Sequence, residues 1–174
     1  MSVLITRRVP VLCILLTLYV SSARSLPTQT FLVSATIVAG CAVSGTNTGV
    51  FGTLDFGTHS GVSSTSVSAS YVQSTTIILA CTPGTTLNMS INGGIHASSN
   101  TRHLKIANFS DQITYRLFTN SSHSAASEIP INQNVAVTYS DSNNITLPIY
   151  GLLQLSGVKR AGNYSDTLTV TLSW

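Results

Sequence analysis

The chain has 174 residues, of which 43% are hydrophobic and only 7% are charged, a length and composition typical of a single globular domain with few surface charges. Its formal net charge is +3, yet three of the eight basic residues, Arg7, Arg8 and Arg24, lie within the first 25 positions. The five remaining basic residues are matched by five acidic ones, a balance that argues against a nucleic-acid partner, which would require a basic surface.

The first 25 residues are predicted to be a signal peptide. Arg7 and Arg8 form a basic start, and residues 9–20 form an apolar run that is short for a bilayer span. Small residues follow, so cleavage after Ser25 or after Ala23 satisfies the usual small-residue rule. An uncleaved membrane anchor is the alternative. The signal predicts export from the cytoplasm.

Residues 26–40 contain an alternating segment. Successive side chains of an alternating strand point to opposite faces. Here the side chains of one face are all apolar, and those of the other face are mixed. Nine extended residues span roughly 30 Å, enough to run along the edge of a β-sandwich. This segment can pair with its own domain or add a strand to another chain, and periodicity leaves both open. The apolar set is Phe31, Val33, Ala35, Ile37 and Ala39.

Two cysteines, Cys41 and Cys81, remain after the predicted signal, which carries Cys13. An even pair in an exported protein predicts a disulfide, with two buried thiols as the alternative.

The remainder is predicted to be all-β. Short β-branched or alternating runs are separated by turn residues such as Pro83-Gly84 and Asn92-Gly93-Gly94. About eight strands with one disulfide fit a β-sandwich. The clearest strand ranges are 67–72, 75–81, 86–91, 113–119, 135–139 and 166–174.

The last of these ranges has the clearest alternation. Its threonines and Ser173 point to one face of the predicted strand, and its apolar residues point to the other. The sequence ends there, so we expect this strand to have an open edge that invites pairing with another chain. The apolar residues are Leu168, Val170, Leu172 and Trp174.

No pattern of catalytic, cofactor-binding or metal-binding residues is found. The four histidines lack metal-ligand spacing, and the five acidic residues are scattered. Asp55 is interpreted as a turn residue whose carboxylate bonds nearby backbone amides. The chain is therefore predicted to be no enzyme and to take no small-molecule substrate.

Several segments, in this order, resemble the spore-coat-U-type pilin family, the subunits of archaic chaperone–usher pili. Together with the cysteine pair and the signal, they cover nearly all of the mature chain. The segments are 39–43 (AGCAV), 51–57 (FGTLDFG), 77–84 (IILACTPG), 91–94 (INGG), 147–151 (LPIYG) and 161–170 (AGNYSDTLTV).

This resemblance implies an incomplete immunoglobulin-like β-sandwich that lacks its last strand, formed by residues 41–174. A periplasmic chaperone and then the N-terminal strand of the next subunit, delivered at an outer-membrane usher, would complete it. The donor would be residues 26–40, and the edge of the acceptor groove would be the apolar face of residues 168–174. Cys41 and Cys81 would form the family's disulfide.

The implied function is a structural subunit of a surface pilus of a Gram-negative bacterium, acting in adhesion and biofilm formation. Two alternatives remain. One is a self-contained β-sandwich that binds carbohydrate or a surface, and the other is a structural protein of a spore or cell coat.

Overall fold

A computed structural model describes residues 32–45 and 50–174. The chain divides into two units, residues 1–36 and residues 37–174. The predicted signal peptide and Phe31 lie outside the described residues. In the first unit, the described residues 32–36 form no helix or strand. In the part of the chain that the structure describes, no helix is long and apolar enough to cross a bilayer.

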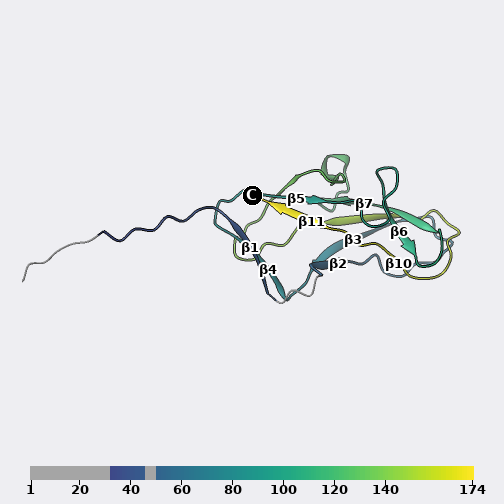
Figure 1. Ribbon diagram of the computed structural model, residues 1–174. Coiled ribbons are helices and arrows are strands. Elements are labelled where there is room, and N and C mark those ends of the chain that lie inside the picture. The colour runs from purple at the N-terminus through teal and green to yellow at the C-terminus, as the bar shows by residue number, and fades with distance from the viewer. Residues whose placement is uncertain (1–31, 46–49) are drawn as a thin grey trace, which may run out of the picture. The chain divides into compact units, whose positions relative to one another are not determined.

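The described residues of the second unit form strands and loops, apart from one short 3-10 helix, η1 (Ala125–Ser127) (Figure 1). This confirms the all-β prediction for the described residues. The strands are β1 (Cys41–Gly45), β2 (Gly52–Leu54), β3 (Ser66–Gln73), β4 (Ile77–Cys81), β5 (Leu87–Ile91), β6 (Arg102–Ile106), β7 (Gln112–Phe118), β8 (Val135–Val137), β9 (Tyr150–Gln154), β10 (Tyr164–Ser165) and β11 (Val170–Ser173).

These strands form three sheets in which every strand pair is antiparallel. The largest has the order β10-β6-β7-β9-β3-β2, the second has the order β11-β5-β8, and the third is the pair β1-β4. The six-stranded sheet therefore ends at β2, and the three-stranded sheet ends at β11.

The core lies against β4, β5, β7 and β9. In β4 and β5, every second side chain is buried, which is the pattern of a strand with one face toward a core. Full burial of each such side chain contributes about 1.5–3 kcal/mol of transfer free energy. The fully buried residues of the core include Leu79, Leu87, Met89, Ile91, Leu117 and Ile129.

The predicted strand ranges agree with β3, β4, β5, β7 and β8, and with part of β11. One expectation needs correction. Residues 166–169 are not strand, because side chains supply part of their hydrogen bonding. Residues 32–40 are assigned to no strand and pair with none of the described strands, so their predicted role as a donor to another chain stays a prediction. Strands β1, β2, β6, β9 and β10 were not predicted.

The predicted disulfide between Cys41 and Cys81 is confirmed. These residues are directly opposite each other in the β1–β4 ladder. The backbone N–H of Thr82 also donates to the carbonyl of Gly40 at 2.8 Å. The end of the N-terminal segment is thus fixed to β4 both covalently and by a backbone hydrogen bond.

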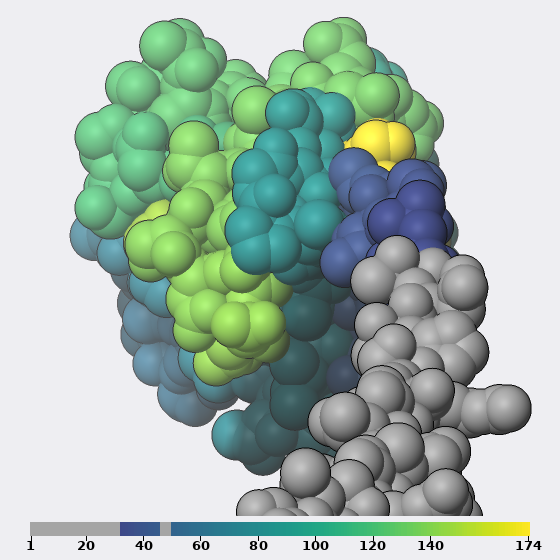
Figure 2. Space-filling view, turned by 90° about the vertical axis from the view of Figure 1, so that its left-hand side faces the viewer, coloured from purple at the N-terminus to yellow at the C-terminus, as the bar shows by residue number. Residues whose placement is uncertain are grey.

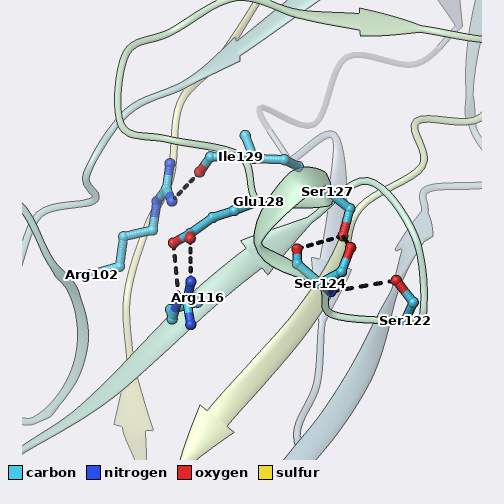
Figure 3. Close-up of polar contacts among 7 residues, drawn as sticks. All are labelled: Arg102, Arg116, Ser122, Ser124, Ser127, Glu128 and Ile129. Atoms are coloured by element: carbon cyan, nitrogen blue, oxygen red, sulfur yellow. Dashed lines mark hydrogen bonds and ion pairs between the residues drawn. The ribbon is translucent and has the colours of Figure 1, made fainter.

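A buried arginine fixes the loop that follows β7. Arg102 is only 4% exposed, and its guanidinium donates to the carbonyl of Ile129 at 2.8 Å (Figure 3). It also donates to the carbonyls of Ile91 and Asn92, each at 3.0 Å. Burial lowers the pKa of this guanidinium, although arginine stays charged in proteins. Its charge therefore stabilises the loop through carbonyl dipoles.

The same loop is held from outside by an ion pair. Arg116 of β7 binds Glu128 through two hydrogen bonds, one of them 2.9 Å between Nε and Oε1 (Figure 3). In the turn before Glu128, the hydroxyl of Ser124 donates to that of Ser127 at 3.2 Å. These contacts fix the loop without involving the open sheet edges.

Candidate functional site

Two of the strands at sheet ends, β2 and β11, flank a cavity. Among the described residues, β2 pairs only with β3, and β11 pairs only with β5. Each strand therefore leaves one row of backbone N–H and C=O groups without a strand partner. Such an edge is a template for another strand.

This cavity has a volume of about 390 Å³. One wall is residues 50–56 and the other is residues 166–170, while buried core residues form the floor. The lining is mainly apolar and aromatic, and its main members are Phe51, Leu54, Phe56, Tyr71, Ile91, Tyr115, Leu117, Ile149, Leu168 and Val170.

A second cavity, of about 630 Å³, continues from the first. Both share Leu54, Phe56, Leu104 and Asp166 in their linings. The walls of the second cavity extend to Ser63 on one side and back to Lys159 on the other. We call the two cavities together the edge groove. Its two walls run antiparallel, and the lining becomes more polar away from β11.

The predicted groove residues are distributed along one wall. Leu168 and Val170 line the edge groove, and Leu172 packs against the core beyond it. Trp174 is 60% exposed. Its indole Nε1 lies 3.9 Å from the point where a Cβ on Gly40 would stand. Figure 2 shows the C-terminal residues (yellow) at the surface at this end of the second unit.

The predicted donor residues are only partly described. Phe31 lies outside the described residues, and Val33 and Ala35 belong to the first unit. Ile37 and Ala39, in the second unit, are exposed, Ile37 by 85%. Their role as a donor strand stays a prediction.

The opposite wall was missed by the sequence analysis. Residues 51–57 contributed to the family resemblance but were not assigned to the groove. The prediction for Asp55 is confirmed, since its Oδ1 accepts a hydrogen bond from the backbone N–H of Gly57 at 2.8 Å. This turn orients the wall, and Leu54 and Phe56 on it pack over Gly151 of β9, where an added Cβ would lie 2.6–2.7 Å from their side chains.

One residue of the groove lining, Tyr71, has a buried hydroxyl. The oxygen of Tyr71 is inaccessible and lacks a hydrogen-bond partner among the described residues, and burial raises the pKa of Tyr71 to about 12. Any Cβ on Gly52 would overlap this hydroxyl. Glycine at position 52 therefore allows the ring of Tyr71 to lie beneath the edge strand.

One charged group lies between the two cavities. Asp166 accepts a hydrogen bond from the hydroxyl of Tyr115 at 2.7 Å and another from the backbone N–H of Ile95 at 2.9 Å. Burial, followed by this hydrogen bond, raises the pKa of Tyr115 far above its ordinary value. Tyr115 therefore stays a neutral donor to the carboxylate.

The described residues contain no group of three or more His, Cys, Asp or Glu side chains that could hold a metal ion. His59 is exposed, with its Nε2 2.6 Å from the carbonyl oxygen of Phe56, whereas His103 lies in β6 and is half-buried. The geometry of the site is that of an apolar cleft between the outer edges of β2 and β11, which no described strand covers.

Residues 27–171 match the family model of the Spore Coat Protein U domain. The chain belongs to the Spore Coat Protein U domain family. This confirms the family resemblance seen in the sequence. No curated protein matches the chain.

This Spore Coat Protein U chain is also similar to solved structures of chaperone–usher systems. One is the CsuC–CsuE chaperone–tip adhesion subunit pre-assembly complex from the archaic Csu pili of Acinetobacter baumannii, with 20% identity and a TM-score of 0.48. The similarity covers 80% of this chain and only 40% of that chain.

A chaperone–usher pilus, solved to explain rod uncoiling, has 14% identity and a TM-score of 0.48, covering 87% of this chain and 99% of that chain. A chaperone–tip adhesin complex of CFA/I fimbriae has 16% identity and a TM-score of 0.40, covering 76% of this chain and 41% of that chain.

Proposed function

We propose that the chain is a non-enzymatic structural subunit of a chaperone–usher pilus, and that its edge groove takes the N-terminal strand of a neighbouring subunit. The observation that carries this proposal is the apolar groove between two unpaired sheet edges. An added strand would hydrogen-bond to the open edge of β11 and place alternate side chains in the groove. The incoming strand is residues 26–40 of another copy or of a related subunit.

The energetics favour a long-lived contact between the incoming strand and the edge groove. If five apolar side chains enter the groove and each gains about 1–3 kcal/mol of transfer free energy, the gross gain is of order 10 kcal/mol. Ordering the incoming strand opposes part of this gain. Because each subunit would give one strand and receive another, the contact is head-to-tail and builds an open fibre.

The position of Gly40 bears on the alternative arrangement, in which residues 26–40 fold back into the edge groove of their own chain. Gly40 lies beside Trp174, at the C-terminal end of β11. A segment folded back from there would run parallel to β11, whereas a strand from another chain is free to run antiparallel. Antiparallel pairs are slightly more stable per residue. This supports exchange between chains.

The export and assembly steps follow from the same proposal. The signal peptide would direct the chain to the periplasm, where a chaperone would occupy the edge groove until an outer-membrane usher adds the subunit to the fibre. The assembled pilus would lie at the cell surface and act in adhesion and biofilm formation.

A charge in the predicted donor tests the proposal. Ile37→Asp places a carboxylate among the side chains that would enter the groove, and burying it unpaired is strongly unfavourable. The exported chain is expected to form ladders that resist SDS until boiled, and the variant is expected to remain monomeric. Thr36→Asp, on the alternate set, is the matched control and should still form ladders. Monomers from the unaltered chain, or ladders from Ile37→Asp, would contradict the proposal.

A further inference from the structure

The β11 wall of the edge groove begins at Asp166, whose carboxylate anchors it to neighbouring segments. Its Oδ1 accepts hydrogen bonds from the backbone N–H groups of Ile95 at 2.9 Å, His96 at 3.3 Å and Thr167 at 2.9 Å. Its Oδ2 accepts the hydroxyl of Tyr115 at 2.7 Å. Hydrogen bonds to a charged acceptor contribute more than neutral ones. The three contacts to Ile95, His96 and Tyr115 therefore fix the start of this wall to other segments.

The turn at residues 92–94 is shaped to receive this carboxylate. Gly94 has a φ of +84°, and a Cβ on it would overlap Oδ2 of Asp166. Glycine is thus needed at position 94 for both its backbone conformation and the close approach. Gly84 has nearly the same φ, +82°, but a Cβ there would meet no atom within 4 Å.

Asn92 fixes the same wall further along. Its backbone N–H donates to the carbonyl of Thr169 at 3.1 Å, and its side-chain Oδ1 accepts the N–H of Thr169 at 2.9 Å. The same Oδ1 accepts the N–H of Gly94 at 3.1 Å. A side chain therefore extends the β5–β11 ladder past Val170, to residues that are not strand.

These contacts connect the wall to the turn that follows β5 and to Tyr115 of β7. We propose that the Asp166 junction, formed by Asp166 with Tyr115, Asn92 and Gly94, is a positioning device that holds the wall open for an incoming strand. This inference rests on the proposed function of the groove.

The physical reason is the exposed apolar face of the empty groove. Leu168 stands opposite Leu54 and Phe56 across the cavity that all three line. Without the junction, residues 166–169 are free to move inward and bury Leu168 against that wall, which closes the groove. Only the open fraction of molecules binds, so the apparent affinity and the association rate both fall with that fraction.

Association kinetics test the proposal. Full chains carrying Ile37→Asp, which prevents self-assembly, are mixed with a labelled peptide of residues 30–40. Asp166→Ala and Gly94→Ala are each expected to lower the association rate constant about tenfold, in proportion to the open fraction. Gly84→Ala carries the same backbone strain without the overlap, and we expect its rate to change by less than about twofold.

The conservative variant separates positioning from general stability. In Asp166→Asn, the amide oxygen can still accept the three backbone N–H groups, so the association rate is expected to stay within about threefold of the unaltered groove. If Asp166→Ala lowers the melting temperature but leaves the association rate unchanged, the junction is only structural and the inference is wrong.

Two further outcomes remain decisive. If Asp166→Ala does not fold, Tyr115→Phe, which removes only the hydroxyl bonded to Oδ2, should still slow association measurably, and an unchanged rate would overturn the inference. If the peptide does not bind even the chain in which Asp166 is intact, the proposed function of the groove is wrong. If the peptide binds all variants at the same rate, the proposed function holds and only the inference about the junction is wrong.

Discussion

Strands β5 and β11 are neighbours with the same alternating pattern but different burial. In β5, Leu87, Met89 and Ile91 are completely enclosed, with Met89 at 0% exposure. In β11, Val170 and Leu172 are only half-buried. The strands differ in their surroundings, since β5 has a strand on each side and β11 has one. Burial of an apolar face therefore depends on what stands opposite it as well as on the sequence of the strand.

We call the part of the molecule around β4 and β5, where alternate side chains are buried, the closed side. It depends on the disulfide, and removing the disulfide is expected to have the largest effect on the free energy of unfolding. Cys41 and Cys81 are 40 residues apart, and closing such a loop stabilises a fold by roughly 4 kcal/mol in the chain-entropy model. We expect Cys41→Ala with Cys81→Ala to lower the free energy of unfolding by about this amount in urea titrations. A loss below about 1 kcal/mol would show that the reduced chain is already constrained.

A truncation inside β5 tests the closed side directly. Met89→Ala leaves a cavity in a fully enclosed core, and such changes cost about 2–5 kcal/mol. We expect this loss in the free energy of unfolding whether or not a donor peptide is present. A strong dependence on the peptide would mean that the core around β5 is also incomplete.

The corresponding truncation in β11 sharpens the comparison. Leu172→Ala removes a half-buried side chain, so the loss for the chain without peptide is expected to be only about 1 kcal/mol. With the peptide of residues 30–40 bound, the loss should increase toward that of Met89→Ala, because the added strand covers β11. Equal losses with and without peptide would contradict the proposed strand addition.

The smallest effect is expected at the ion pair remote from the groove. Arg116 holds the pKa of Glu128 below its ordinary value, but the two side chains are 48% and 33% exposed, so solvent screens the interaction. Glu128→Gln should cost less than about 1 kcal/mol at pH 7.

The pH dependence gives the sign of this contribution. A carboxyl with a depressed pKa in the folded state stabilises the fold above its unfolded pKa and loses that effect as the pH falls through the folded value. The difference between the chain and the Glu128→Gln variant should therefore shrink below about pH 4. If the difference in the free energy of unfolding between the chain and the Glu128→Gln variant grows as the pH falls, the stabilisation comes from a titratable group other than Glu128.

Alternation and turn residues were sufficient to predict β3, β4, β5, β7 and β8, because their side chains alternate between core and solvent. Strand β6 was missed because it begins with Arg102. An arginine in a sequence normally indicates an exposed position, and its burial here depends on hydrogen bonds to carbonyls of other segments. Strand β9 was missed because Gly151 interrupts it. That glycine is explained only by the side chains of Leu54 and Phe56, which come from a distant part of the chain.

The candidate site was half predictable for a similar reason. The β11 wall shows its apolar face in its own sequence, so Leu168 and Val170 could be named. The opposite wall is a three-residue strand followed by a turn, and its role depends on the pairing of β2 with β3. The junction at Asp166 brings together residues from three separate segments, which no local pattern records.

The disulfide has a mechanical consequence for a fibre built as proposed. Tension along such a fibre would enter each subunit through residues 37–40 and reach Cys41 directly afterwards. Because Cys41 is bonded covalently to Cys81, this load passes at once into β4, whose alternate side chains are buried in the core. Strand β1 therefore cannot peel away under force, and a pulled fibre should yield elsewhere first.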